Sequence, residues 1–219
     1  SMIYNHYDNF KSYINLKKTN EYLVAENAKL YSRLQKQEKK GDAYIKKDKL
    51  FYYQEAKVIN NTINKRNNFI TLNKGEKHGV KKGMGVITKN GVIGIVHSIS
   101  KRYSVIISLL HRRSSIGVKL KKNNHNGILK WNGKDYRTGN IMNFPNHIEI
   151  NKGDTIITNS HSLIFPERID IGTVKYSKKG KEGYYIVEVK LFEDFNKLEY
   201  VYIISSKENK EQENLEKNI

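Results

Sequence analysis

The chain has 219 residues, 37% hydrophobic and 28% charged, a composition typical of a globular protein with one large or two small domains. It contains no cysteine, which excludes disulfide bonds, thiol catalysis and cysteine–zinc sites. The net charge of +18 is carried mainly by lysine, 33 of 40 basic residues, whereas nucleic-acid readout favours arginine. We therefore expect no nucleic-acid partner, and a polyanion-binding module that takes an anionic membrane surface or cell-wall polymer remains an alternative.

The first segment, residues 1–45, is predicted to be a helix that forms a coiled coil, ended by Gly41 and Asp42. Leucines seven residues apart and the residues between them form a narrow stripe on a polar surface: Tyr13, Leu16, Asn20, Leu23, Asn27, Leu30 and Leu34. Asparagine inside such a stripe costs stability but favours a parallel dimer in one register. We predict that this stripe is a dimer interface; a solvated helix that packs on its own chain stays open as an alternative.

The second segment, residues 51–206, changes period. Short runs of β-branched and aromatic residues recur between turn residues, and Asn90-Gly91 is a strong hairpin signal. No helical pattern intervenes, so we predict a mainly β fold in which the N-terminal coiled-coil helix is followed by two small six-stranded β-barrel-like domains. We expect a discontinuous first barrel from 51–112 and 170–206, a second barrel from 113–169 inserted into it, and a disordered tail at 207–219. A simple tandem of two barrels is the alternative.

Motifs of catalysis and metal binding are absent from the sequence. It has no Gly-x-Ser-x-Gly, no His-Glu-x-x-His and no phosphate loop, and its seven histidines lack metal-ligand spacing. Ser160, His161 and Asp154 are the only local cluster with the residue types of a chymotrypsin-like serine hydrolase, and adjacent residues on an extended chain point apart. We therefore predict no catalytic residue, no metal site and no cofactor, with a serine hydrolase kept as an alternative.

Six short sequence motifs occur in a characteristic order: Glu26–Leu30, Leu72–Val86, Asn90–Val96, Lys152–Thr158, Phe165-Pro166 and Ile171–Val174. This order resembles the extracytoplasmic region of the MreC family, bacterial rod-shape-determining scaffold proteins. The chain departs from the family pattern at Thr158-Asn159-Ser160, where the family usually has Thr-Ser-Gly. The resemblance and the turn chemistry together predict structural turn positions: Gly75, Gly79, Gly83, Gly91, Gly94, Gly153, Asp154 and Gly172.

The resemblance implies a function as well as a fold. MreC proteins are non-enzymatic scaffolds of the wall-elongation machinery, held at the inner membrane by an N-terminal helix, with their barrels in the periplasm or outside the membrane. We therefore expect an anchor before residue 1, self-association, and partners among MreB, MreD, RodZ, RodA and the elongation-specific penicillin-binding transpeptidase. We also expect the barrels to offer strand edges and a groove to those partners.

Overall fold

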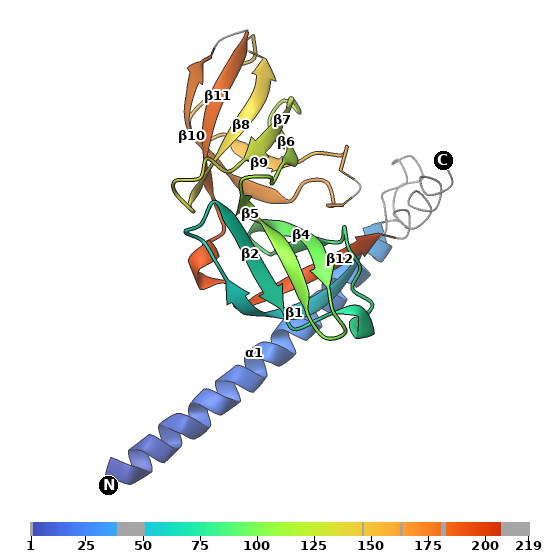
Figure 1. The fold of residues 1–219 in the computed structure, drawn as a ribbon, viewed down its shortest axis with the longest axis vertical. Helices are drawn as coiled ribbons and strands as arrows, with labels where there is room; N and C mark the ends of the chain where they lie inside the picture. Colours follow the sequence, from blue (N-terminus) through green and yellow to red (C-terminus); the bar gives the residue numbers. More distant parts are fainter. Residues whose placement is uncertain (1, 39–50, 146, 163, 181–182, 207–219) are drawn as a thin grey trace.

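The computed structural model describes residues 2–38, 51–145, 147–162, 164–180 and 183–206. A long helix, α1 (Met2–Glu38), leads into two closed six-stranded β-barrels, which confirms the predicted fold class. In Figure 1 the amino-terminal part of α1 projects away from both barrels, and its carboxy-terminal part lies beside the first one. The segment 39–45, where the helix was expected to end, and the predicted disordered tail at 207–219 lie outside the described residues.

The first barrel takes strands from both ends of the β region. Around the barrel they run in the order β1-β12-β3-β4-β5-β2, with every neighbouring pair antiparallel. Their bounds are β1 (Phe51–Asn61), β2 (Asn67–Leu72), β3 (Gly85–Thr88), β4 (Gly91–Ile99), β5 (Ser104–His111) and β12 (Tyr200–Ser206), with a short 3-10 helix η1 (Glu76–His78) between β2 and β3.

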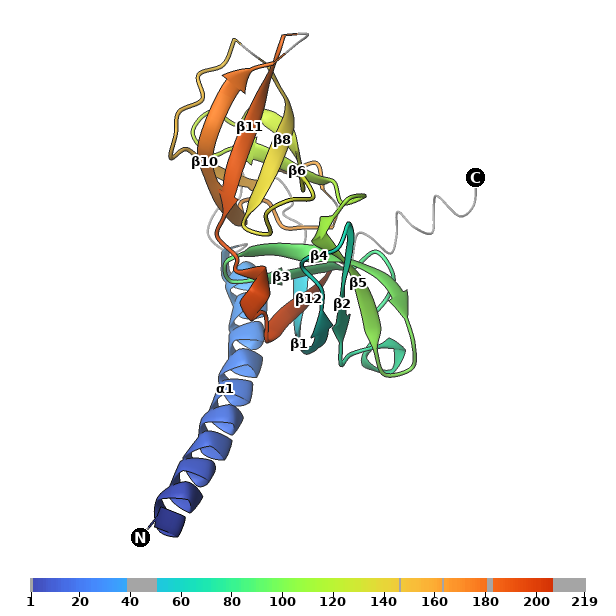
Figure 2. The same cartoon turned by 60° about the vertical axis from the view of Figure 1, so that its left-hand side comes forward.

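The second barrel is built from one continuous stretch of chain. Its order is β10-β11-β8-β7-β6-β9, again antiparallel throughout. The strands are β6 (Ile116–Leu120), β7 (Asn126–Lys130), β8 (Thr138–Pro145), β9 (Thr155–Thr158), β10 (Asp170–Lys179) and β11 (Tyr184–Leu191), and η2 (Phe195–Lys197) leads back to the first barrel. Because β8, β10 and β11 are longer than the other three, they extend beyond them as a three-stranded ribbon (Figure 2).

The predicted division of the chain at residue 170 is wrong. Residues 170–191 were expected in the first barrel, but β10 pairs with β9 through Asp170↔Ile157 and β11 pairs with β8 through Val187↔Ile141. Only β12 returns to the first barrel, where Tyr200 pairs with Lys57. The error has a physical reason: strands of both barrels show the same alternation, and alternation does not say which barrel a strand closes.

The predicted glycines divide into turn positions and strand positions. Four of them have positive φ in turns or at the start of a strand: Gly79, Gly83, Gly91 and Gly153. Gly75 precedes η1, whereas Gly94 and Gly172 lie inside β4 and β10, so their assignment as turns is wrong. A Cβ at Gly94 would stand 2.1 Å from the carbonyl oxygen of Ile107 on the paired strand, so a close approach of two backbones requires this glycine.

Asp154 forms a turn contact. Its carboxylate accepts a hydrogen bond from the backbone N–H of Asn151, three residues upstream, at 2.8 Å. It also pairs with Lys122 Nζ at 2.8 Å, and this ion pair ties the β9 approach to the β6–β7 turn.

His111, at the end of β5, is the one buried histidine among the described residues whose pKa is displaced. Burial lowers this pKa from 6.5, and the charges of Arg113, Arg112 and His97 lower it further. Its Nδ1 accepts a hydrogen bond from the Arg113 backbone N–H at 3.0 Å, and the Phe69 ring lies 5.0 Å away, centroid to centroid. The folded barrel therefore favours the neutral form of His111 over the protonated form.

A pair of glycine substitutions tests the two structural roles. Gly94→Ala is expected to destabilise the chain by about 3 kcal/mol or more, because the new methyl group forces two paired strands apart. Gly79→Asn, although the larger residue, is expected to cost about 1 kcal/mol or less, since Gly79 has open space around it and asparagine tolerates a left-handed backbone. Urea unfolding curves measure both, and equal losses would contradict the distinction.

The lowered pKa of His111 predicts a dependence of stability on pH. The unfolded chain binds a proton near pH 6.5 and the folded chain only at lower pH, so the stabilisation is complete above 6.5 and is lost as the pH falls below it. His111→Asn, whose side-chain oxygen can replace Nδ1 as acceptor, should flatten the change in unfolding free energy between pH 7 and 5. The matched variant His161→Asn, at an exposed loop position, should keep the parent slope.

Candidate functional site

The carboxy-terminal part of α1 binds the first barrel through one face. Ala28 is buried and Val24 packs against the same core, while the ring of Tyr31 lies 5.6 Å from the rings of both Tyr53 on β1 and Tyr202 on β12. These contacts come from residues three or four apart, which share one side of a helix. The helix is therefore fixed on the barrel along this stretch.

Polar contacts support the same face. Ser32 Oγ accepts a hydrogen bond from the Tyr53 backbone N–H at 3.3 Å, and Tyr200 Oη donates to Glu21 Oε1 at 3.2 Å. Burial raises the pKa of Tyr202, as do Tyr31 and Glu55, while a hydrogen bond with Asn27 lowers it. The docked face thus combines apolar packing with directional bonds at its rim.

The leucines of the predicted stripe point away from this contact. Leu16 is 70% exposed, Leu23 52% and Leu30 47%, although each is a large apolar side chain on an ordered helix. Asn20 is exposed as well. The structure therefore keeps the leucine stripe apart from the face that binds the barrel.

Three other predicted stripe residues differ from these leucines. The side chains of Tyr13 and Leu34 lie outside the described ones, although both residues belong to α1. Asn27 is exposed but forms its hydrogen bond with Tyr202 of the same chain, so it stands at the border between the stripe and the docked face.

A second apolar surface lies on the ribbon of the second barrel. Met142, Tyr176, Tyr184 and Ile186 are each about half exposed, and we call these four residues the second-barrel patch. The pairing places them on the outer face of the strands, since Tyr176 lies opposite Glu188 while the neighbouring Val187 and Val189 point into the core. Lys175 pairs with Glu188 at 2.6 Å at the rim, and this hydrogen bond raises the pKa of Lys175.

The second-barrel patch was not predicted from the sequence. The signal was the run Tyr184–Val187, four apolar residues without the polar alternation that a half-exposed strand normally has. Such a run buries alternate residues and leaves the others as apolar groups on the surface.

Strand edges were expected to receive partners, and barrel closure removes most of them, because each of the twelve described strands pairs with a neighbour on both sides over part of its length. The ribbon is the exception: β10 runs to Lys179 but pairs with β9 only up to Thr173, and β8 runs to Pro145 but pairs with β7 only up to Met142. Binding of a partner at these edges stays a prediction.

The chemistry of the described residues gives no sign of a catalytic centre. Asp154 is committed to Asn151 and Lys122, and Ser160 and His161 lie exposed in a loop. Within the described ranges, no group of three or more histidine, aspartate or glutamate side chains could hold a metal ion. Across the same residues, no helix has both the length and the apolar character that crossing a bilayer requires.

Comparison with known proteins agrees with this arrangement. The family described as "Rod shape-determining protein MreC, barrel core" matches residues 58–205. The Cell shape-determining protein MreC of Haemophilus influenzae is 28% identical over 136 residues, which cover 62% of this chain and 38% of that protein. The chain thus spans less than half the length of the curated relatives it matches.

Solved structures share the fold. MreC of Listeria monocytogenes superposes with a TM-score of 0.70 at 22% identity, covering 87% of this chain and 94% of that one. MreC from Helicobacter pylori, solved in a complex with Penicillin-Binding Protein (PBP2), superposes with a TM-score of 0.57 at 18% identity, covering 70% and 98%. At these identities the likeness concerns the fold. The curated relatives are named for determining cell shape.

Proposed function

Because the chain belongs to the MreC family of rod shape-determining proteins, we propose that it is a self-associating scaffold of bacterial wall elongation. The observation that carries the proposal is the exposed leucine stripe on a helix whose other face is fixed to the first barrel. A membrane anchor ahead of the helix and a position outside the cytoplasm follow from family membership and are part of the proposal.

The stripe is suited to a second copy of the same helix. With Leu16, Leu23 and Leu30 at the d positions of a heptad, Val24 and Tyr31 fall at e and Ala28 at b. The barrel therefore covers one flank of the helix and leaves the three d leucines and Asn20 open to a partner helix, while Asn27, also at an a position, bonds Tyr202. Asn20 at an a position would bond its counterpart across a parallel dimer and set the register.

The second-barrel patch is the surface we assign to a partner of the elongation machinery. Its four apolar residues lie on the ribbon farthest from the projecting helix, and the related Helicobacter pylori protein has been solved with a penicillin-binding protein. Aromatic and methionine side chains are enriched at protein interfaces. We propose the elongation-specific penicillin-binding transpeptidase as the occupant; contacts with MreB, MreD, RodZ and RodA rest on family membership alone.

Substitution of the central leucine tests the helix stripe. Leu23→Lys places a charge in the seam, and we expect it to abolish the dimer while β circular dichroism stays unchanged. Sedimentation velocity over a concentration series measures the effect. Tyr22→Lys is the matched control, because Tyr22 is also a large, exposed side chain on the same helix but lies outside the stripe, and this variant should still dimerise. A dimer that survives Leu23→Lys would overturn the assignment.

Substitution of the patch tests partner binding separately. Ile186→Glu should weaken binding to the extracytoplasmic part of the transpeptidase by at least about tenfold, which corresponds to about 1.4 kcal/mol. Ile59→Glu is the control, since Ile59 is similarly exposed on β1 of the first barrel and belongs to neither surface. Isothermal titration calorimetry gives both affinities. Equal affinities for the two variants would remove the patch from the proposal and leave the helix stripe untouched.

A further inference from the structure

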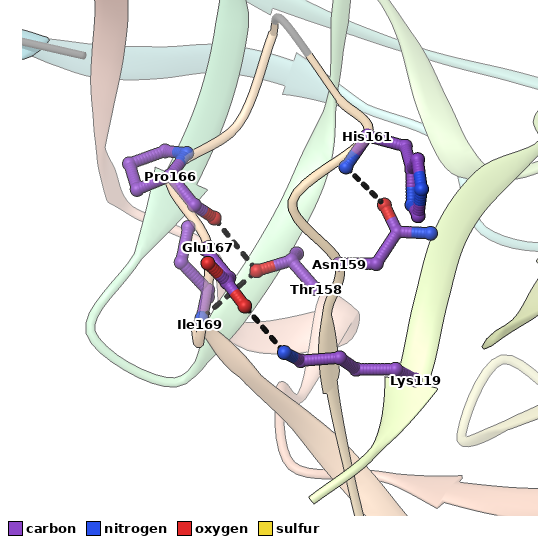
Figure 3. A network of polar contacts seen from close by, with 7 residues as sticks. All are labelled: Lys119, Thr158, Asn159, His161, Pro166, Glu167 and Ile169. Carbon is purple, nitrogen blue, oxygen red and sulfur yellow. Dashed lines mark hydrogen bonds and ion pairs between the residues drawn. The ribbon is translucent and has the colours of Figure 1, made fainter. Parts of the chain in front are cut away.

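The connection from β9 to β10 is described at residues 159–162 and 164–169, and its base is fixed by hydrogen bonds. We call these two described parts the latch loop. Thr158, the last residue of β9, donates its hydroxyl hydrogen to the Pro166 carbonyl at 2.7 Å and accepts from the Ile169 backbone N–H at 2.9 Å (Figure 3). One buried side chain therefore joins the end of β9 to residues 166–169, the part of the loop that leads into β10, which we call the returning arm.

Two further contacts join the base of the loop to strand β6. Lys119, whose side chain is only 9% exposed, forms an ion pair with Glu167 on the returning arm (Figure 3). Asn159 is buried against Gly117, where a Cβ would stand 2.8 Å from the asparagine Oδ1, and that oxygen accepts from the His161 backbone N–H at 3.3 Å. The chain thus has a well-supported loop at the place where it departs from the usual family sequence.

The far side of the loop reaches the other barrel. Phe165 is 3% exposed, although it belongs to a loop of the second barrel. A Cβ on Gly85, the first residue of β3, would stand 2.8 Å from the Phe165 ring and 2.9 Å from Ile204 on β12. Because Gly85 has no side chain, the Phe165 ring fits into the space beside it on the first barrel. We call this space the seat of Phe165.

A second contact between the barrels lies at the other end of the β3–β4 hairpin. Gly91 approaches the backbone of Asp170 so closely that a Cβ on this glycine would stand 3.1 Å from the Asp170 carbonyl oxygen, and the Thr88 hydroxyl donates to the Glu193 carboxylate. Glu193 lies between β11 and η2, on the return connection to the first barrel, and Ile171, next to Asp170, accepts a hydrogen bond from the Phe192 backbone N–H at 3.0 Å. These contacts therefore lie close to that connection. Phe165 holds the opposite end of the hairpin, away from them.

We infer that the latch loop fixes the orientation of the second barrel relative to the first, with Phe165 as the inserted residue and the Lys119–Glu167 ion pair as its brace. The two connections between the barrels, residues 112–115 and 192–199, act together with the β3–β4 turn as a hinge. Without a further contact, the second barrel could still rotate about this hinge. The latch loop removes that rotation. It thereby sets the direction in which the second-barrel patch faces relative to α1, whichever partner the patch binds.

The absence of cysteine allows a direct test by paired spin labels. Lys101→Cys on the β4–β5 turn and Lys134→Cys on the β7–β8 turn place one exposed spin label on each barrel. Pulsed electron–electron double resonance measures the distance between the two labels. The parent chain should give one narrow distance distribution. Phe165→Ala should broaden it while circular dichroism remains that of two folded barrels, and His161→Ala, an exposed position of the same loop, should leave it narrow.

Glu167→Gln tests the brace without touching the inserted ring. It leaves the buried Lys119 ammonium without its carboxylate, which is unfavourable, so the returning arm should shift and the distribution should broaden. Lys119→Met with Glu167→Gln removes the buried charge and should restore part of the narrow distribution. Narrow distributions in both Phe165→Ala and Glu167→Gln would overturn the inference and show that the hinge alone orients the barrels. All of these variants carry Leu23→Lys as well, so that distances between two copies of the chain do not contribute, and the result is then independent of the proposed function.

Discussion

The last strand, β12, is the element on which the remaining structure depends. It lies between β1 and β3, where Tyr202 pairs with Glu55 on one side and with Ile87 on the other, and so it closes the first barrel. Tyr202 also receives the Tyr31 ring of the helix, and Ile204 lies beside the seat of Phe165. A single strand therefore meets the core, the helix and the second barrel.

The contact between α1 and the first barrel divides the helix into a packed face and an exposed face. Packing against the first barrel uses small and aromatic residues on one face, which leaves three leucines exposed on another. In the dimer proposed above, burial of a fully exposed leucine would contribute about 1.5–3 kcal/mol and burial of the half-exposed Leu23 and Leu30 less, while the asparagines would limit the affinity. Because the barrel already orders the carboxy-terminal part of the helix, the proposed dimer would lose less conformational entropy on forming.

Much of this architecture could be predicted from the sequence, because local patterns determine it. The heptad spacing of Leu16, Leu23 and Leu30 predicted the helix, and Asn90-Gly91 marked the turn between β3 and β4. What the sequence did not reveal depends on tertiary contact. Gly94 lies in a strand because a neighbouring backbone approaches it, and Asn27 bonds to Tyr202 because the helix docks where it does. The second-barrel patch needed the strand register, since only the pairing shows that Ile186 points outward.

The placement of β12 also determines the order in which the molecule can fold. The second barrel is made entirely from residues 116–191, although two of its strand pairs, β8–β11 and β6–β9, join strands that are not consecutive in the chain. The first barrel cannot close until the last strand has been synthesised, and its strands β1 and β3 expose open edges until then. During synthesis, therefore, every strand of the inserted domain is available before β12 can complete the first barrel.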